Sequence, residues 1–394
     1  GDGYKKALAA ILDANVTTLL TAVVLKIFGS GPIESFATTL IIGIFTSVFA
    51  AIIVTRLILE ISIKRNSNLT FSTGMTKNLF KNMNKQFVKN RKKYYLVSGI
   101  LVLGGIVSLA TRGLDWGIEF TGGHSYLVEF QEEIDNEKIK STFDETFVYG
   151  DKTGTVAVKQ KGNSRTAEIK TNFLMNEDSA DSLLTIMVDE SLVKLTPELG
   201  EGTVIAEKSF LSVISEELKS GALISILLSL VIIFIYILIR FGKWQYGLGA
   251  LLAMAHDVIL VLSIFSIGYS FMPFSMEMDQ AFIAAILTVV GYSINDTVVV
   301  FDRIREFIGL NKTKDRKEVI NSALNSTLSR TINTSLSTFV VLLMIFLFGG
   351  PDIKGFVFAL MIGVIVGTYS SLCIATPTVV DLTNSKKIKE GETA

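Results

Sequence analysis

A carboxylate stands beside an amide inside a stretch that is otherwise suited to a lipid bilayer. The segment GYSINDTVVVFDRIRE, residues 291–306, follows the apolar run AFIAAILTVV and places Asn295 next to Asp296. With 3.6 residues per turn, Tyr292, Asp296 and Arg303 fall on one stripe of a helix. A charge at the bilayer centre costs about 2.5–3.5 kcal/mol on insertion scales, and Asn or Ser could fill a packing role at lower cost. We therefore interpret Asp296 as an ion-carrying residue.

Polar residues also occur in other apolar stretches. Besides Asp296, the candidate ion-coupling residues are Asn295 and Arg303 of the same segment and five residues of other stretches: Asp13, Asn15, His256, Asp257 and Arg330. The alternative for each is a hydrogen bond between helices, worth about 0.6 kcal/mol, and Arg330 could also snorkel to the interface. Burial disfavours a carboxylate charge and a nearby Arg favours it. A movement of such an Arg would let one carboxylate load a proton on one side and release it on the other.

The composition indicates a membrane protein without recognisable enzymatic or metal chemistry. The chain has 394 residues, of which 49% are hydrophobic, and its mean hydropathy is +0.49. One Cys and two His argue against an internal disulfide framework and against a zinc site. No phosphate-binding loop, dinucleotide fingerprint, nucleophile elbow or HExxH helix occurs. We predict no cofactor, no metal, no enzyme activity and no nucleic-acid partner.

Eight apolar stretches are long enough to cross the membrane, which takes about 20 helical residues. They cover residues 8–28, 34–61, 94–111, 219–240, 246–270, 280–301, 331–349 and 355–380. The second and the last are long for a single span, so we expect them to tilt or to end in the interface.

The loops between these stretches alternate in charge. Residues 61–93 hold nine Lys or Arg and no acid, and residues 302–318 hold six Lys or Arg. The loops that alternate with the basic ones have no Lys or Arg: 29–34, 273–279 and 349–352. Basic loops stay in the cytoplasm, so we predict that both chain ends are cytoplasmic. Residues 75–93 are predicted to form a basic amphipathic helix on that surface.

One long loop, residues 113–217, is predicted to fold outside the membrane. It carries nine Lys or Arg and twenty-one Asp or Glu, a net charge of −12. Alternating patterns predict strands at 124–130, 155–161, 166–173 and 203–210, with helices at 134–147 and 177–195. The order βαββαβ is that of a ferredoxin-like domain.

The chain contains an internal repeat. ALAAILDANVTTLLT, residues 7–21, aligns with ALNSTLSRTINTSLS, residues 323–337. FGSGPIESFATTLIIGI, residues 28–44, aligns with FGGPDIKGFVFALMIGV, residues 348–364. Membrane repeats usually form two pseudo-symmetric halves around a central site. We expect the chain to be the C-terminal part of a longer protein, with the first four spans of its first half absent.

Six motifs make the chain resemble the SecD/SecF protein-export family. Four look like SecF motifs: GIEFTGG (117–123), HDV (256–258), GYSINDTVVVFDRIRE (291–306) and SRTINTS (329–335). Two are similar to the last two spans of SecD: ILDANVTTL (11–19) and GPIESFATTLIIGI (31–44). GIEFTGG supplies a motif at the start of the outer domain, with four candidate residues: Gly117, Glu119, Gly122 and Gly123. Glu119 stands where the family usually has Asp.

The resemblance implies an RND-like helical membrane fold and a role in protein secretion. It implies an auxiliary, ion-driven subunit of the Sec translocase in the bacterial inner membrane, in which Asp296 and Arg330 match positions tied to ion coupling. The implied partners are the SecYEG channel, the translocating preprotein, YajC and SecA, together with the SecD portion ahead of this chain. Two alternatives stay open: an RND-type exporter of lipids or small molecules, and a scaffold of the translocon that transports nothing.

The predicted organisation has six parts. They are two SecD-like spans (1–62), a basic linker (63–93), a first SecF-like span (94–112), the outer domain (113–217), five SecF-like spans (218–381) and a cytoplasmic tail (382–394).

Overall fold

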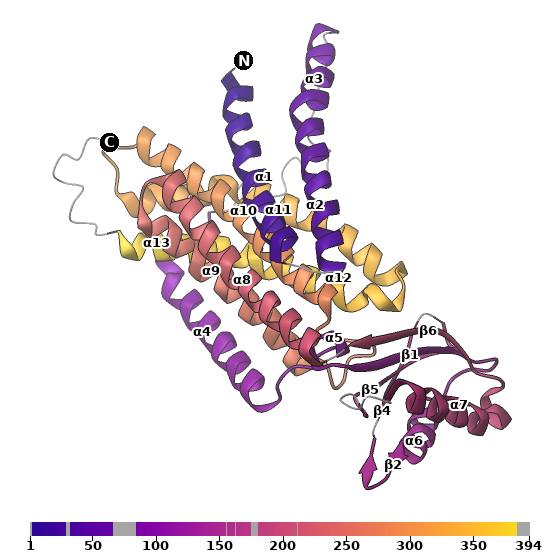
Figure 1. Ribbon diagram of the computed structural model, residues 1–394. Coiled ribbons are helices and arrows are strands. Elements are labelled where there is room, and N and C mark those ends of the chain that lie inside the picture. Colours follow the sequence, from indigo (N-terminus) through magenta and orange to yellow (C-terminus); the bar gives the residue numbers. More distant parts are fainter. Residues whose placement is uncertain are drawn as a thin grey trace.

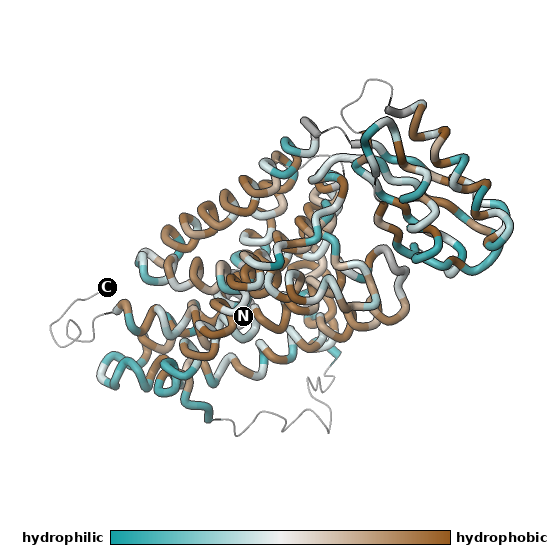
Figure 2. Tube along the Cα trace, turned by 90° about the horizontal axis from the view of Figure 1, so that it is seen from below, coloured by the Kyte–Doolittle hydropathy of each residue, from teal (hydrophilic) through white to brown (hydrophobic). Residues whose placement is uncertain are grey.

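The structure is a computed structural model that describes residues 2–28, 32–65, 84–154, 156–161, 163–174, 180–210 and 212–383. It has two parts, a bundle of long helices and a smaller domain built on a sheet (Figure 1). Long stretches of the bundle helices consist of hydrophobic residues, whereas hydrophilic and hydrophobic residues are mixed along the chain of the sheet domain (Figure 2).

Eight helical spans in the described chain are long and apolar enough to cross a membrane, as the sequence predicts. Six are single helices: α1 (Asp2–Phe28), α4 (Phe87–Thr111), α8 (Ser212–Phe241), α9 (Trp244–Gly268), α10 (Gln280–Leu310) and α11 (Arg316–Phe348). The other two are composite: α2 (Pro32–Phe49) runs through η1 (Ala50–Val54) into α3 (Thr55–Lys64), and α12 (Pro351–Ser370) runs through η2 (Ser371–Ala375) into α13 (Thr376–Leu382).

One predicted apolar stretch is part of a longer helix, and one predicted helix boundary was wrong. The span expected at 331–349 is the second half of α11, which begins at Arg316, because the polar first half carries no apolar signal. Residues 87–93, expected in a separate surface helix, are the start of α4. Residues 75–83 of that predicted helix lie outside the described residues.

The internal repeat is visible in the backbone. Both composite spans contain a π-helical segment, and 321 residues separate Ala50 from Ser371, where these segments begin. The Thr55 hydroxyl donates to the Ala50 carbonyl at 3.1 Å, and the Thr376 hydroxyl donates to the Ser371 carbonyl at 3.2 Å. Each hydroxyl thus bonds the carbonyl five residues earlier, which is the spacing of a π turn. The two copies share a local distortion as well as a sequence pattern.

Helix α10 lies at the centre of the bundle and packs against α1, α9, α11 and α12. Ile286, Val290, Ile294 and Phe301 are almost fully buried along its length. By contrast, α11 exposes large apolar side chains such as Val341 and Phe348 over its second half. A polar side chain on the buried face of α10 is therefore enclosed by protein.

The sheet domain has the strand order β4-β5-β1-β6, with all three neighbouring pairs antiparallel. The strands are β1 (Gly123–Glu129), β4 (Val156–Gln160), β5 (Thr166–Thr171) and β6 (Thr203–Phe210), and the helices are α6 (Asn136–Thr146) and α7 (Ala180–Leu199). This is the pairing of a split βαβ unit, as the element order predicts. A two-strand ribbon, β2 (Val148–Tyr149) with β3 (Lys152–Thr153), was not predicted.

Alternation along the strands separates an apolar face from a charged face. On β5, Ala167 and Ile169 are fully buried in a core with Phe143 of α6 and Leu184 of α7. Successive strand residues point to opposite faces, so the intervening Glu168 and Lys170 lie on the other face. That charged face meets the loop between α9 and α10.

Candidate functional site

The most deeply buried carboxylate of the described chain is Asp257 of α9, whose exposed fraction is 0%. Its Oδ1 lies 2.9 Å from His256 Nδ1. Its Oδ2 accepts hydrogen bonds from Ser293 Oγ at 2.5 Å and from Ser370 Oγ at 2.7 Å. Since Ser293 belongs to α10 and Ser370 to α12, one carboxylate joins three spans.

Asp296 lies on α10 one helical turn beyond Ser293, and only 7% of its surface is exposed. Its Oδ2 accepts a hydrogen bond from Ser335 Oγ of α11 at 3.4 Å, close to the limit for such a bond. Ser335 Oγ in turn lies 2.6 Å from Thr368 Oγ1 of α12. Asp296 is thus enclosed by three helices but weakly bonded.

Both carboxylates are connected through α10 and α12. Ser293 and Asp296 are three residues apart on α10, and Thr368 and Ser370 are two residues apart on α12. Seven side chains thus form a polar layer across α9, α10, α11 and α12 in an otherwise apolar bundle. They are His256, Asp257, Ser293, Asp296, Ser335, Thr368 and Ser370.

The structure does not show the Asp–Arg pairing that the sequence suggests at Asp296. Arg330 is exposed, and within the described residues no ion pair of 4.0 Å or less joins it to Asp296. Arg303 donates instead to Ser326 Oγ at 3.0 Å and to Glu306 Oε2 at 2.6 Å. Arg303 therefore lies outside the polar layer, at the end of the bundle away from the sheet domain.

Asp13 is paired, but with a residue that the sequence left out of the site. Arg240 of α8 donates to both Asp13 oxygens, at distances from 2.5 to 2.9 Å. Tyr236 donates to Asp13 Oδ1 at 3.1 Å, and Arg240 also lies 4.0 Å from Asp302. Asp13 thus belongs to an ionic cluster between α1, α8 and α10, separate from the polar layer.

The two asparagines take no part in the polar layer. Asn15 donates to the Ile11 carbonyl of its own helix at 2.8 Å, and Asn295 is half-buried. Gly291, one turn before Asn295, lies against Thr18 and Thr21 of α1.

The glycine motif lies where the sheet domain meets the bundle. Gly117 precedes the short helix α5 (Ile118–Thr121), and its amide donates to the Met278 carbonyl at 3.0 Å. Gly122 has φ of 77° and Gly123 has φ of 130°, a region that favours glycine. A Cβ on Gly123 would also lie 2.3 Å from the Thr171 carbonyl oxygen. Glu119 Oε2 is buried without a hydrogen-bond partner among the described residues.

Sequence reasoning missed the four hydroxyl side chains of the polar layer: Ser293, Ser335, Thr368 and Ser370. Ser293 could have been found in the sequence, because it lies one helical turn before Asp296. For Thr368 and Ser370 no comparable signal exists, because isolated hydroxyls are common in membrane helices and usually bond their own backbone.

Two family models match the parts of the chain that contain the glycine motif and most of the bundle. Residues 194–385 match the family "Protein export membrane protein SecD/SecF, C-terminal", and residues 107–134 match the "SecD/SecF GG Motif". The chain is 42% identical over 311 residues to protein translocase subunit SecF of Rhodothermus marinus, which covers 77% of this chain and 95% of that protein. The chain belongs to the SecD/SecF protein-export membrane protein family.

Other relatives within the SecD/SecF family are longer than this chain. Protein translocase subunit SecDF of Thermus thermophilus is 31% identical over 399 residues, covering 100% of this chain but only 50% of the relative. The crystal structure of SecDF from Thermus thermophilus superposes with a TM-score of 0.81 at 30% identity, covering 96% of this chain and 49% of that structure. The chain thus spans about half the length of its SecDF relatives and nearly all of the SecF relative.

A more distant structure shares the fold alone. The hedgehog release protein Disp of the water bear superposes with a TM-score of 0.58 at 10% identity. This likeness concerns the helical fold alone and carries no information about function.

Proposed function

We propose that this chain serves as an auxiliary subunit of the Sec preprotein translocase and uses the proton or sodium gradient to promote polypeptide export. Family membership supports the assignment to protein export, since its SecF and SecDF relatives are named as translocase subunits. The proposed partners are the SecYEG channel, the translocating preprotein, YajC, SecA and the SecD portion that SecDF relatives carry. In this proposal the chain performs no enzymatic reaction.

The observation that carries the proposal is the environment of Asp296. A carboxylate that is enclosed by three helices and held by one long hydrogen bond can change its charge without disrupting a saturated network. Binding of a proton would neutralise Asp296 and remove its attraction for the Ser335 hydroxyl and for more distant cations such as Arg330. The spacing of α10, α11 and α12 would then respond to the loading of the ion.

The proposed orientation places both chain ends in the cytoplasm and residues 113–217 outside. Arg240, Lys243 and the basic residues of 302–318 lie at the bundle end away from the sheet domain, as the positive-inside rule requires. A cysteine in place of the exposed Lys314 should resist a membrane-impermeant maleimide added to intact cells, and a cysteine in place of the exposed Lys208 of β6 should react. Efficient labelling at position 314 contradicts this orientation.

Secretion in cells tests the function. Asp296→Asn keeps the shape of the side chain but cannot carry a proton, so we expect it to abolish the gradient-dependent part of preprotein secretion while the protein accumulates normally. Asp302→Asn, the same change on the same helix outside the polar layer, serves as the matched control and should secrete at the normal rate. Normal secretion by the Asp296→Asn strain contradicts the proposal.

A further inference from the structure

The sheet domain is attached to the bundle by backbone hydrogen bonds as well as by its covalent links. Met278, in the loop before α10, donates its amide to the Asp115 carbonyl at 2.7 Å and accepts from the Gly117 amide at 3.0 Å. A Cβ on Gly117 would lie 3.3 Å from the Met278 carbonyl oxygen and 2.6 Å from Glu119 Oε2. The glycine thus permits the close approach of these two segments.

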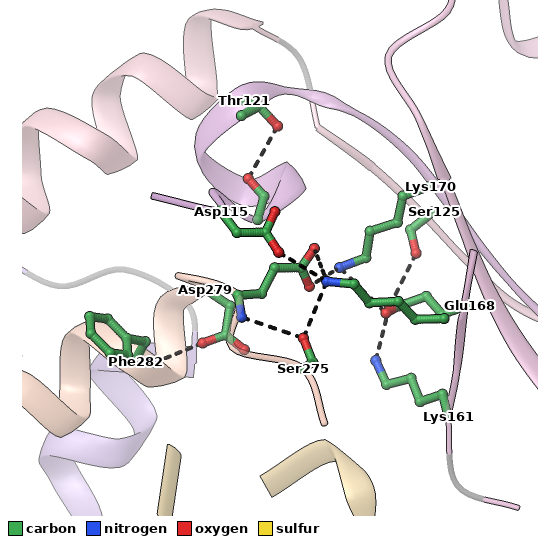
Figure 3. A network of polar contacts seen from close by, with 12 residues as sticks. Asp115, Thr121, Ser125, Lys161, Glu168, Lys170, Ser275, Asp279 and Phe282 are labelled. Carbon is green, nitrogen blue, oxygen red and sulfur yellow. Dashed lines mark hydrogen bonds and ion pairs between the residues drawn. The ribbon is translucent and has the colours of Figure 1, made fainter. Parts of the chain in front are cut away.

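Ion pairs from the charged face of the sheet reinforce this attachment (Figure 3). Lys170 of β5 lies 2.6 Å from Glu277, and both side chains are largely buried, with exposed fractions of 11% and 13%. Lys159 of β4 lies 3.4 Å from Glu277 and 3.1 Å from Asp115. Lys159 Nζ also donates to Ser275 Oγ at 3.4 Å. Two strands therefore converge on one carboxylate of the α9–α10 loop.

The charges of this network stabilise one another. Burial opposes the charge of Lys170, but the carboxylates of Glu277 and Glu168 raise its pKa above the ordinary value. Burial likewise opposes the charge of Glu168, but Lys170 and Lys161 lower its pKa. Largely buried partners lose more on separation than exposed ones, because removal of one leaves an uncompensated charge.

The network ends at the first turn of α10. Glu277 precedes Gln280, the first residue of the helix, by three positions. Between them, Asp279 accepts a hydrogen bond from the Phe282 amide at 2.7 Å and caps the helix. Burial, together with Glu119 and Glu277, raises the pKa of Asp279 to about 6. The helix then continues without a break to Asp296, about 24 Å further along its axis at 1.5 Å per residue.

We propose that Glu277, Lys159 and Lys170 are positioning residues that transmit displacement of α10 to the outer sheet domain. The domain is covalently joined to α4 and α8, so without this network only the backbone hydrogen bonds at Met278 would couple a shift of α10 to the sheet. A helix moves as a rigid body when its core is well packed. The inference rests on the proposed function, because it assumes that α10 moves when the ion binds and connects this movement to the sheet domain outside the membrane.

Amide exchange of the full chain in lipid nanodiscs tests the attachment. Gly117 and Met278 supply the reporter amides, because both are hydrogen-bonded across the contact. We expect Glu277→Gln to raise the exchange rate of both amides about tenfold or more, because it removes a largely buried charge partner. Lys170→Met should have the same effect. Because both changes break the same ion pair, the double variant should raise the rate by much less than the product of the two single effects. Lys138→Met serves as the control, because Lys138 pairs with Glu198 at 3.0 Å within the outer domain. Unchanged exchange in Glu277→Gln overturns the proposal.

Transmission needs a second readout. Asp296→Asn should alter exchange in β5 when Glu277 is present and leave β5 unchanged in the Glu277→Gln background. In cells, Glu277→Gln should keep gradient-driven ion uptake and lose most gradient-dependent secretion, which a defect in folding alone does not produce. An equal response of β5 to Asp296→Asn with and without Glu277 contradicts the transmission. Failure of the proposed function is recognised separately, by normal secretion in the Asp296→Asn strain.

Discussion

The two buried aspartates of the bundle differ in how completely they are bonded. Asp257 is fully enclosed and has His256, Ser293 and Ser370 within hydrogen-bonding distance. Asp296, at 7% exposure, has one donor in the described structure, Ser335 at 3.4 Å. A fully bonded carboxylate is costly to disturb, whereas a weakly bonded one can change state. We infer that Asp257 holds the helices in place and that Asp296 carries the ion.

The largest effect should come from removing the fully bonded carboxylate. Asp257→Ala leaves His256, Ser293 and Ser370 without their shared partner, so we expect a loss of about 3–5 kcal/mol in the free energy of unfolding. Asp296→Ala, the corresponding change at the weakly bonded position, should lose about 1–2 kcal/mol. Unfolding of both variants in mixed micelles measures the difference, and equal losses would remove the distinction between the two residues.

A smaller effect should follow from removing one donor of Asp257. Ser370→Ala deletes the hydrogen bond to Asp257 and should cost about 1.5–3 kcal/mol, the range for a hydrogen bond to a charged group. Ser371→Ala is the matched control, because among the described residues the Ser371 hydroxyl donates only to the Thr368 carbonyl, at 3.0 Å. The same unfolding assay applies. Equal stability of the two variants would show that the third donor is dispensable.

The smallest effect on stability is expected at Ser335. Its hydrogen bond to Asp296 is long, and Thr368, which lies 2.6 Å from Ser335 Oγ, keeps the Val364 carbonyl as an acceptor at 2.6 Å. Ser335→Ala should therefore cost less than about 1 kcal/mol while still lowering gradient-dependent secretion. Ser337→Ala, whose hydroxyl donates to the Thr334 carbonyl of α11 at 2.8 Å, should leave secretion unchanged. The comparison is contradicted by a Ser335→Ala protein that is strongly destabilised or that secretes normally.

Much of the fold could be predicted from the sequence, because it depends on patterns local to one segment. The eight spans follow from apolar length, and the four strands follow from alternation. The internal repeat was readable from aligned letters, although its shared π segments were not. The β2–β3 ribbon could not be predicted, since each strand has two residues and alternation needs a longer run.

The pairing of charged side chains could not be predicted in the same way. The sequence suggested Arg330 as the counter-charge of Asp296, whereas the structure pairs Asp13 with Arg240. Periodicity gives the face of a helix on which a residue lies, but pairing also depends on the rotation and height of the neighbouring helix. The hydroxyl donors Ser293 and Ser370 were missed for the same reason.

Ion flux through the protein tests most directly the claim that Asp296 carries the coupled ion. Inside-out membrane vesicles from cells carrying the protein or its Asp296→Asn variant would be energised, and the decay of the ion gradient would be followed with a fluorescent indicator. The account predicts that the wild-type protein accelerates the decay and that Asp296→Asn does not, whereas Asp302→Asn behaves as the wild type. A decay in Asp296→Asn vesicles at the wild-type rate would show that another group carries the ion and that Asp296 only packs.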